Sequence, residues 1–556
     1  MVLQYIVWPT SLKTQIEELY YHVSFEPDIT IDGLLKIPSK SFISFNTYFN
    51  MFSGKTWIKY TIIKKCIFRL IVDGRGTVYL KKEDGCIIAK QKFCGKEEIK
   101  IVLNEIEPVF YYIKIKADES VTILFGSVET EQEGREIRIA LATCTYNRKE
   151  MLYKNIRFLR EKNNKLVDNE RVLDEIYIVD NASNINSSEV ECEWIKLIPN
   201  RNTGGAGGFT RGLQEAMKNI NITHIILMDD DVDIEFESMV RTKSVLRYIK
   251  GEYEDNFIGG AMFRKDKPYV LHAAGEDWAD GLIINPYKST DMRESVAVQK
   301  ISELVKSNQV YAGWWYCCIP RKHVEKKGYP IPFFLHCDDV EYSLRSGKTP
   351  IYLNGIAVWH EEFENKRNSI MEYYDVRNRL ITNALYKEHG KLYDAIYILC
   401  ERFYANVFRY RYEDFLLSVK AAEDFLKGPE WQKSVDAEVL HKELSVYGYY
   451  MDDVQEIPEK EKYSIKNKLF IIGRYFFIAK GRDVIQIGAP VSAYVGKKEL
   501  LLVEPKSKKG FVVRKSWKKT LCCIGWLFTI LLKLLLRYYN KANSWCLGRK
   551  KNNASF

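Results

Sequence analysis

Residues 223–233 read Thr-His-Ile-Ile-Leu-Met-Asp-Asp-Asp-Val-Asp. Four of the five residues before the first acid are large and apolar, and this run ends abruptly in the three carboxylates of Asp229–Asp231. The pattern predicts a buried parallel strand whose carboxyl end opens into a polar region. Three adjacent like charges are tolerable where water surrounds them or a cation shares them, and hard oxygen ligands favour Mg²⁺ or Mn²⁺. A solvated acidic loop after a core strand is the alternative for the triplet taken alone.

Strands and helices alternate around this stretch from Ile137 onward, which predicts a Rossmann-like, mainly parallel sheet. Strands are expected at 137–143, 175–179 and 195–198 before the one that ends at Asp229, with helices at 149–159 and 211–217. Because parallel strands bring their carboxyl ends to one edge, the polar residues at these four ends are expected to lie together. They are Thr143, Asp180, Asn202 and Asp229. Such an edge suits a nucleotide, since a carboxylate can accept from a uracil N–H or from ribose hydroxyls.

A glycine-rich stretch follows the third predicted strand. Residues 200–208 read Asn-Arg-Asn-Thr-Gly-Gly-Ala-Gly-Gly and lead into the helix expected at 211–217. Glycines such as Gly204 and Gly205 let backbone N–H groups and a helix N-terminus approach a ligand closely. The stretch is neither a Gly-x-Gly-x-x-Gly motif at the first strand–helix turn nor a Gly-Lys-Ser/Thr phosphate loop. A glycine-rich connector without a ligand is the alternative.

A second acidic pair, Asp338-Asp339, follows the apolar segment 332–337 and enters a predicted helix, whose N-terminal dipole favours negative charge. A helix N-cap explains one acid, and two are slightly more than a cap needs. Further along, a predicted strand that begins at Ile351 ends in His360, next to Glu361. It is a candidate metal ligand, with a structural histidine as the alternative.

Adjacent tryptophans, Trp314 and Trp315, lie in the aromatic run Tyr-Ala-Gly-Trp-Trp-Tyr at residues 311–316. Neighbouring side chains of an extended chain point to opposite sides. One tryptophan is therefore expected in the core, and the other is a candidate for stacking on a sugar.

The rest of the chain predicts two further regions of an α/β multidomain protein. Short alternating runs between residues 42 and 128, separated by turn residues, predict an antiparallel β-sandwich or jelly-roll over residues 1–132. Apolar residues at spacings of three and four from Met371 to Tyr450 predict helices. The Rossmann-like domain is thus expected at 133–385 and an α-helical domain at 386–556.

The C-terminal tail is basic. Between Glu504 and Lys551 there are 13 Lys or Arg and one acid, around an apolar stretch of 16 residues at 521–536. This stretch is shorter than the roughly 20 residues that span a bilayer. It suits an amphipathic helix on an anionic membrane surface, and a buried helix in an all-helical tail is the alternative.

Length, net charge and cysteine usage indicate a protein of several domains in a reducing compartment, without the charge pattern of a nucleic-acid-binding protein. A chain of 556 residues exceeds a single compact core, and a net charge of +10, spread along the chain except at the C-terminus, does not indicate nucleic-acid binding. The 12 cysteines include no Cys-x-x-Cys pair or zinc-like spacing, which favours a reducing compartment. Residues 1–9 lack the basic and apolar regions of a signal peptide, so we expect a cytoplasmic protein.

Taken together, these motifs resemble the GT-A glycosyltransferases of inverting family 2, and within them the bacterial galactofuranosyltransferases that extend a galactan from UDP-galactofuranose. The resemblance covers roughly residues 40–400, including an N-terminal β-sandwich. Its order and spacing, rather than any one motif, make it specific. The segments that carry it are 47–50, 143–148, 179–183, 200–209, 228–231, 314–315, 338–345 and 359–360.

The resemblance implies a role for each candidate residue. Asp229, Asp231 and His360 would hold a divalent cation, Mn²⁺ or Mg²⁺. Asp339 would be the general base, with Asp338 orienting the acceptor beside it. The remaining assignments are the donor-site residues Thr143, Arg148, Asp180, Asn202, Gly204, Gly205, Asp229 and Asp230, and the acceptor-site residues Glu276, Trp314 and Trp315.

The function expected from this resemblance is metal-dependent, inverting transfer of galactofuranose from UDP-galactofuranose to a glycan or lipid-linked acceptor in cell-wall polysaccharide biosynthesis. The physical logic agrees, because one in-line displacement needs a base on the acceptor side and a charge sink on the leaving side. The enzyme would lie at the inner face of the plasma membrane, and its C-terminal helices could form a homo-oligomer contact. The alternatives are a rhamnosyl or galactopyranosyl donor, and a non-catalytic glycan-binding scaffold.

Overall fold

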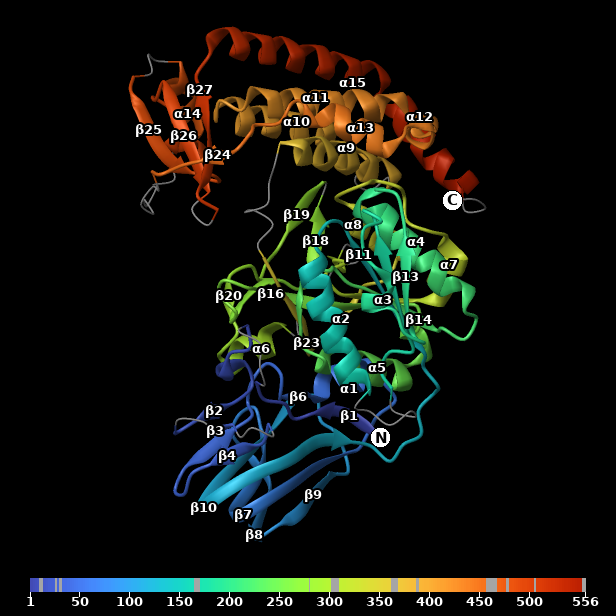
Figure 1. Cartoon of the computed structure of the whole chain (residues 1–556), viewed down its shortest axis with the longest axis vertical. Coiled ribbons are helices and arrows are strands. Elements are labelled where there is room, and N and C mark those ends of the chain that lie inside the picture. Colours follow the sequence, from blue (N-terminus) through green and yellow to red (C-terminus); the bar gives the residue numbers. More distant parts are fainter. Residues whose placement is uncertain are drawn as a thin grey trace.

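The computed structural model describes residues 1–9, 14–25, 28–29, 33–164, 171–279, 281–301, 310–361, 369–386, 390–456, 468–476, 480–504 and 507–552. Its elements form three successive layers along the long axis of the molecule (Figure 1). An N-terminal sheet lies at one end, a mixed sheet flanked by helices lies in the middle, and a helical layer lies at the other end.

Ten antiparallel strands form the N-terminal sheet. Two long strands organise it, β7 (Cys66–Lys82) and β10 (Phe110–Glu129), which pair along most of their length. Their register shifts between Ala117 and Val121 and again between Ile123 and Phe125, and such bulges bend a strand. The antiparallel architecture agrees with the prediction, although the strands form one continuous hydrogen-bonded sheet.

The central sheet also has ten strands, but it is mixed rather than mainly parallel. Four strands run parallel in the order β13-β12-β11-β14. Beyond them β22 (Cys317–Pro320) lies antiparallel between β14 and β16 (Ile258–Arg264), and this inserted strand breaks the expected parallel pattern. The four parallel strands are β11 (Ile139–Thr145), β12 (Glu175–Asp180), β13 (Ile195–Pro199) and β14 (His224–Leu227).

The glycine-rich stretch is the first turn of a helix, α4 (Gly204–Lys218), rather than a loop before a helix starting at Arg211. Close packing on the sheet explains its composition. A Cβ atom on Gly208 would lie 2.0 Å from Cys144 Sγ, and one on Gly212 would lie 2.7 Å from Ala142 Cβ. Only glycine lets this helix lie so near β11.

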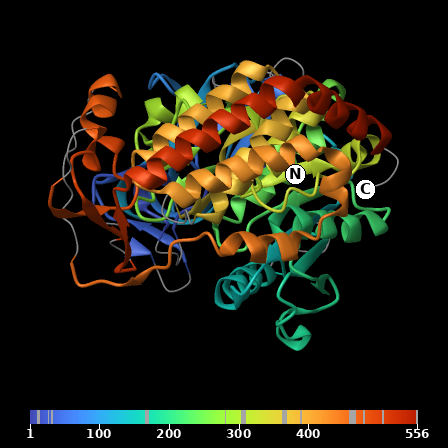
Figure 2. The ribbon, with the colours of Figure 1, turned by 90° about the horizontal axis from the view of Figure 1, so that it is seen from above.

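Four helices make up most of the third layer: α9 (Ile370–Leu385), α10 (Leu392–Val407), α11 (Tyr412–Lys427) and α15 (Trp517–Asn552). They run side by side when the molecule is seen from above, with α15 on the outer side (Figure 2). The buried side chains of α9 belong to the same apolar cluster as those of α10, α11 and α15. Helix α9 therefore belongs to the helical layer, and its start at Ile370 agrees with the helical pattern predicted from Met371 onward.

A small four-stranded sheet accompanies these helices, which the sequence analysis did not predict. Its strands are β24 (Asp452–Asp453), β25 (Arg482–Gln486), β26 (Glu499–Glu504) and β27 (Lys509–Arg514). The four central residues of β26 are all buried, so the strand lacks the alternation that distinguishes a strand from a helix segment.

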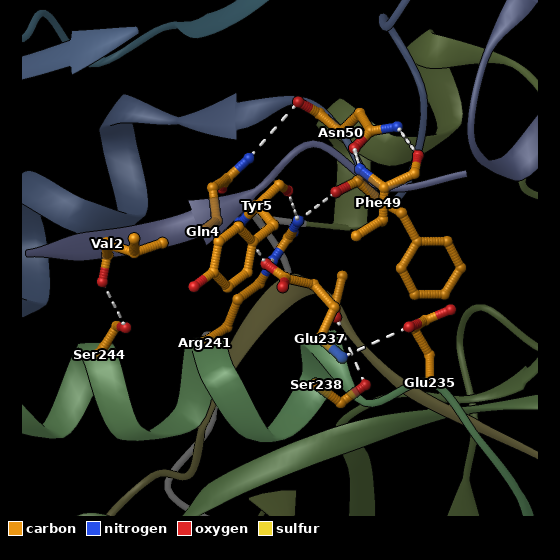
Figure 3. A network of polar contacts seen from close by, with 12 residues as sticks. Val2, Gln4, Tyr5, Phe49, Asn50, Glu235, Glu237, Ser238, Arg241 and Ser244 are labelled. Carbon is orange, nitrogen blue, oxygen red and sulfur yellow. Dashed lines mark hydrogen bonds and ion pairs between the residues drawn. The ribbon is translucent and has the colours of Figure 1, made fainter. Parts of the chain in front are cut away.

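A buried polar network joins the N-terminal sheet to the central domain (Figure 3). Arg241, on α5 (Glu237–Tyr248), is fully buried and its Nε donates to Glu237 Oε1 at 2.9 Å. Its guanidinium also donates to the carbonyl oxygens of Asn354, at 2.9 Å, and Phe49. The backbone N–H of Tyr5 in turn donates to Glu237 Oε1 at 2.8 Å. The helix that follows the acidic segment is thus held directly by the N-terminal region.

Candidate functional site

Asp229, Asp231 and His360 lie together, as expected from sequence. One ligand atom from each lies within 4.8 Å of the other two. His360 ends β23 (Ile351–His360), which pairs with β15 (Asp233–Ile234) immediately after the acids. Its Nε2 lies 3.0 Å from Asp231 Oδ1, while its Nδ1 faces the carbonyl oxygen of Glu361. The two carboxylates suit Mn²⁺ or Mg²⁺, and the imidazole nitrogen is a ligand that transition metals accept more readily than Mg²⁺.

Cationic side chains surround this acidic cluster. Arg148 Nη1 lies 2.9 Å from Asp231 Oδ2 and 3.1 Å from Asp230 Oδ1. Lys265 Nζ donates to the carbonyl oxygen of Asp231 at 2.7 Å. Burial raises the pKa of Asp230 despite the adjacent Arg148. The side-chain cations of Arg148 and Lys265 therefore both lie beside the acidic cluster.

Lys265 and Asn155 are residues of this site that the sequence analysis missed. Lys265 follows the last residue of β16, which runs parallel to β23, so a lysine at that strand end was a usable signal. Asn155, on α2 (Lys149–Asn164), donates from Nδ2 to the carbonyl oxygens of Asp230 at 3.0 Å and Val232 at 2.9 Å. An asparagine inside an amphipathic helix carries no such signal.

The parallel strand ends meet at one edge, as predicted, but their polar groups differ in availability. Both carboxylate oxygens of Asp180 are engaged by its own loop, with Ala182 N at 3.0 Å, Asn184 N at 2.7 Å and Ile185 N at 2.8 Å. The buried hydroxyl of Thr143 has no hydrogen-bond partner within the described part of the chain. The Thr143 hydroxyl thus keeps its hydrogen-bonding capacity, while the Asp180 carboxylate shapes its own loop.

The glycine stretch and Asn202 lie at the same edge. Asn202 Oδ1 accepts from Gly204 N at 3.1 Å, at the start of α4. Gly204 has a φ of +69°, which an L side chain rarely adopts. Gly205 is partly exposed, and a Cβ there would meet only Leu335 Cδ2, at 3.9 Å. The helix N-terminus therefore has one glycine required by packing and one with open space beside it.

Asp338 and Asp339 begin α8 (Asp338–Ser346) and are half-buried. Burial raises the pKa of Asp338 to about 6. Burial also raises the pKa of Asp339 well above its usual range, and the negative charges of Asp338, Glu276 and Asp229 add to the rise. Because Asp339 responds to Asp229, the two acidic groups share one electrostatic environment although more than a hundred residues separate them in sequence.

Glu276 lies on β18 (Glu276–Ala279) and is buried. Its carboxylate accepts from the Tyr311 hydroxyl at 2.5 Å and from Asn285 Nδ2 at 3.0 Å. Burial raises the pKa of Glu276 above its usual range in spite of these donors. Tyr311 and Asn285 are further site residues that the sequence pattern did not single out, because a lone tyrosine or asparagine has no distinctive spacing.

Neither tryptophan presents an open ring face, because Trp314 and Trp315 are only 4% and 5% exposed. Trp315 Nε1 donates to the Gly260 carbonyl oxygen at 2.8 Å, so this residue is part of the core. Trp314 packs edge-on against Phe209, with ring centroids 5.3 Å apart, and its buried indole N–H has no partner among the described residues. The structure therefore gives these positions a packing role in place of the expected stacking surface.

Comparison with known proteins places two domains on this chain. The family described as galactofuranosyltransferase 2 N-terminal matches residues 4–128, and the family described as glycosyl transferase family 2 matches residues 141–303. The two matches coincide with the N-terminal sheet and with the part of the central domain that carries Asp229–Asp231. His360 and the Asp338–Asp339 pair lie beyond the second match.

Two curated relatives are similar over most of the chain. Galactofuranosyltransferase GlfT2 of Mycobacterium tuberculosis is 27% identical over 463 residues, which are 76% of this chain and 70% of that protein. Galactofuranosyltransferase GlfT2 of Mycolicibacterium smegmatis is 27% identical over 433 residues, which are 71% of this chain and 66% of that protein.

Among solved structures, the Pyrobaculum calidifontis mannosyltransferase in complex with GDP-Man and Mn²⁺ matches with a TM-score of 0.31 and 14% identity, over 56% of this chain and 81% of that one. The two family matches and the two curated relatives show that this chain is a glycosyltransferase, with a glycosyl transferase family 2 domain behind a galactofuranosyltransferase 2 N-terminal domain.

Proposed function

We propose that this glycosyltransferase moves galactofuranose from UDP-galactofuranose to a glycan or lipid-linked acceptor, with inversion and with help from Mn²⁺ or Mg²⁺. The N-terminal domain match and the names of both curated relatives support the donor. The observation that carries the mechanism is the cluster of Asp229, Asp231 and His360, whose ligand atoms lie within 4.8 Å of one another.

On the leaving-group side, Asp229, Asp231 and His360 would hold the cation, which when bound supplies positive charge against the diphosphate. Arg148 and Lys265 add two protein cations to the same place. Asn155 stabilises the backbone of the acidic segment, because its amide donates to the carbonyl oxygens of Asp230 and Val232. Charge stabilisation by groups already in position is the largest contribution that most enzymes make to such a step.

On the acceptor side, Asp339 would be the base. The acceptor hydroxyl oxygen forms a bond to the anomeric carbon, the bond from that carbon to the phosphate oxygen breaks, and the hydroxyl proton goes to the Asp339 carboxylate. A carboxylate with a raised pKa is a stronger base near neutral pH than an ordinary aspartate. Asp338 would orient the acceptor beside it, and Glu276, held by Tyr311 and Asn285, would line the acceptor site.

For the donor nucleotide, Thr143 offers a buried hydroxyl and the start of α4 offers backbone N–H groups. Helix N-terminal N–H groups favour phosphate oxygens. Asp180 and Asn202 would act by shaping the loops around the uridine, since their side-chain oxygens already accept backbone N–H groups. Gly205 leaves room for a ligand close to the backbone.

We also propose that α15 lies on an anionic membrane at the cytoplasmic face, where it would bring the active site to lipid-linked acceptors. Its segment Trp517–Leu547 is long and apolar enough to cross a membrane by composition, and it contains an 18-residue window with a mean hydropathy of 1.8. However, one side of the helix, including Cys523, Ile530 and Leu534, packs into the helical layer. A helix buried along one side and apolar along the other suits the membrane surface.

The deciding experiment is nucleotide release by the purified full chain with Mn²⁺. The donors compared would be UDP-galactofuranose, UDP-galactopyranose and dTDP-rhamnose. Release and acceptor extension with UDP-galactofuranose alone would support the proposal, and preference for either other donor would replace it. Asp339→Asn and Asp231→Asn should each abolish transfer, while Asp255→Asn, at an exposed site paired with Lys326, serves as the control.

A further inference from the structure

The short loop before the acid pair, residues 333–337, is in an unusual conformation. Phe334, His336 and Cys337 all have positive φ values, of 74°, 64° and 63°. Side chains other than glycine rarely adopt this region, so the surrounding structure must impose it. The loop leads directly into Asp338 and Asp339, and its shape therefore sets where their carboxylates lie.

Helix α9 supplies the hydrogen bonds that hold this loop. Asn378 is fully buried, and its Nδ2 lies 2.6 Å from the Leu335 carbonyl oxygen, 3.0 Å from that of His336 and 3.3 Å from that of Phe333. Arg377 Nη2 donates to the Phe333 carbonyl oxygen at 2.8 Å. Arg377 Nε also donates to Asn378 Oδ1 at 3.0 Å, which fixes the amide with its NH₂ group toward the loop.

The same helix also makes an aromatic contact with the loop. The Tyr374 ring stacks on the Phe334 ring with centroids 5.2 Å apart and an interplanar angle of 20°. The Arg377 guanidinium lies 5.2 Å from the Tyr374 ring centroid, so the three side chains brace one another. On its other side, the loop meets α4, where Ala206 N donates to the Phe334 carbonyl oxygen at 3.2 Å.

We infer that Asn378, supported by Arg377 and Tyr374, is a positioning residue that holds the 333–337 loop and so places Asp339 against the acceptor hydroxyl. Helix α9 thereby supports the active site by holding this loop, although it lies beyond the matched family 2 domain. This inference rests on the proposed role of Asp339 as base. Asn378 itself touches neither reacting atom and acts only through the loop.

The informative substitution is Asn378→Asp, because it keeps the shape of the side chain and replaces the NH₂ donor with an acceptor. Three carbonyl oxygens would then face a carboxylate. We expect faster hydrogen–deuterium exchange across residues 333–337 and about a hundredfold fall in kcat, the scale of loss for a misplaced reacting group. KM for the donor and calorimetric binding of UDP with Mn²⁺ should stay near the wild-type values.

Asn406→Asp is the matched control. Asn406 is also a buried asparagine in the helical layer, but its Nδ2 donates to Glu372 Oε1, at 2.8 Å, and not to the loop. Its variant should leave exchange across residues 333–337 unchanged even if it lowers the melting temperature. If Asn378→Asp does not fold, Tyr374→Leu removes the ring under Phe334 and is tested by the same readouts.

Wild-type exchange across residues 333–337 in a folded Asn378→Asp variant would overturn the inference, and so would faster exchange with unchanged kcat. The exchange measurement does not depend on any substrate. If the wild-type enzyme transferred no sugar from any donor tested, the proposed function would fail, while exchange would still decide whether Asn378 holds the loop.

Discussion

Gly204 lies directly against the backbone of Phe334: a Cβ atom on Gly204 would be 2.1 Å from the Phe334 carbonyl oxygen. The first residue of α4 therefore contacts the loop that precedes Asp338. Helix α4 and the loop before the acid pair meet at this point with no room for a methyl group.

Gly204→Ala should consequently destabilise the protein. The new methyl group meets backbone rather than a mobile side chain, and the φ of +69° is itself strained for alanine by about 1–2 kcal/mol. We expect a clear fall in melting temperature by calorimetry. Gly205→Ala is the control, because its Cβ would have open space and alanine should be neutral or stabilising there. Equal stability of the two variants would contradict the close contact at Gly204.

Substitution of the metal-ligand candidates should abolish cation binding. Asp231→Asn removes a charged ligand, and His360→Ala removes the imidazole that faces it at 3.0 Å. Titration of Mn²⁺ followed by electron paramagnetic resonance should show a tight site in the wild type and a loss of at least about tenfold in affinity in each variant, as even outer-shell changes cause. Asp255→Asn should bind like the wild type. Wild-type affinity in both site variants would remove these residues from metal binding.

The pH dependence of kcat should report the charge of Glu276. Asp339 must be ionised to take a proton, so kcat falls as the pH drops through its pKa. Glu276 contributes to raising that pKa, after burial and the charge of Asp338. Glu276→Gln removes the negative charge, so the acid limb of the profile should move to lower pH. Glu325→Gln, an exposed change at a pair with Arg321, should leave the limb in place. If the acid limb of the Glu276→Gln profile lay at the same pH as that of the wild type, the charge of Glu276 would not affect the pKa of the base.

How far the sequence alone specified this site depends on the kind of signal each residue gives. Asp229 and Asp231 follow the apolar run 225–228, and His360 ends a predicted strand, so each was found at a strand end. The resemblance to family 2 enzymes, rather than the local pattern, grouped His360 with the two acids. Tyr311 and Asn378 act through hydrogen bonds to groups distant in sequence, which no local pattern encodes. The buried strand β26 was missed for a related reason, since full burial removes the alternation that identifies a strand.

The buried ion pair between Arg241 and Glu237 should be costly to break on one side only. Arg241→Met leaves the Glu237 carboxylate buried without its cation, which costs about 3–5 kcal/mol in comparable sites. Adding Glu237→Gln should recover much of that loss, because the amide oxygen can still accept from Tyr5 N. Urea denaturation measures both. Lys442→Met, at an exposed pair with Glu438, should change stability by at most about 1 kcal/mol. A small loss in Arg241→Met alone would mean that the pair does not anchor the N-terminal sheet.

The outward face of α15 should determine membrane binding. Phe528, Leu535 and Leu536 are 72%, 57% and 71% exposed, on a helix whose opposite face is packed. Burial of one such side chain in lipid contributes about 1.5–3 kcal/mol, so replacing all three by serine should lower partitioning into phosphatidylglycerol vesicles by well over tenfold.

Charge should also contribute to membrane binding, because basic residues such as Lys518 and Arg537 are attracted to anionic headgroups. Binding of the wild type to phosphatidylglycerol vesicles should therefore weaken as salt is added, and binding to uncharged phosphatidylcholine vesicles should be weaker still. Ile220→Ser, at an apolar side chain that is 82% exposed elsewhere, tests whether any exposed apolar residue suffices. The triple variant differs from the wild type only on the outward face of α15. If it sediments with anionic vesicles as the wild type does, another surface makes the membrane contact.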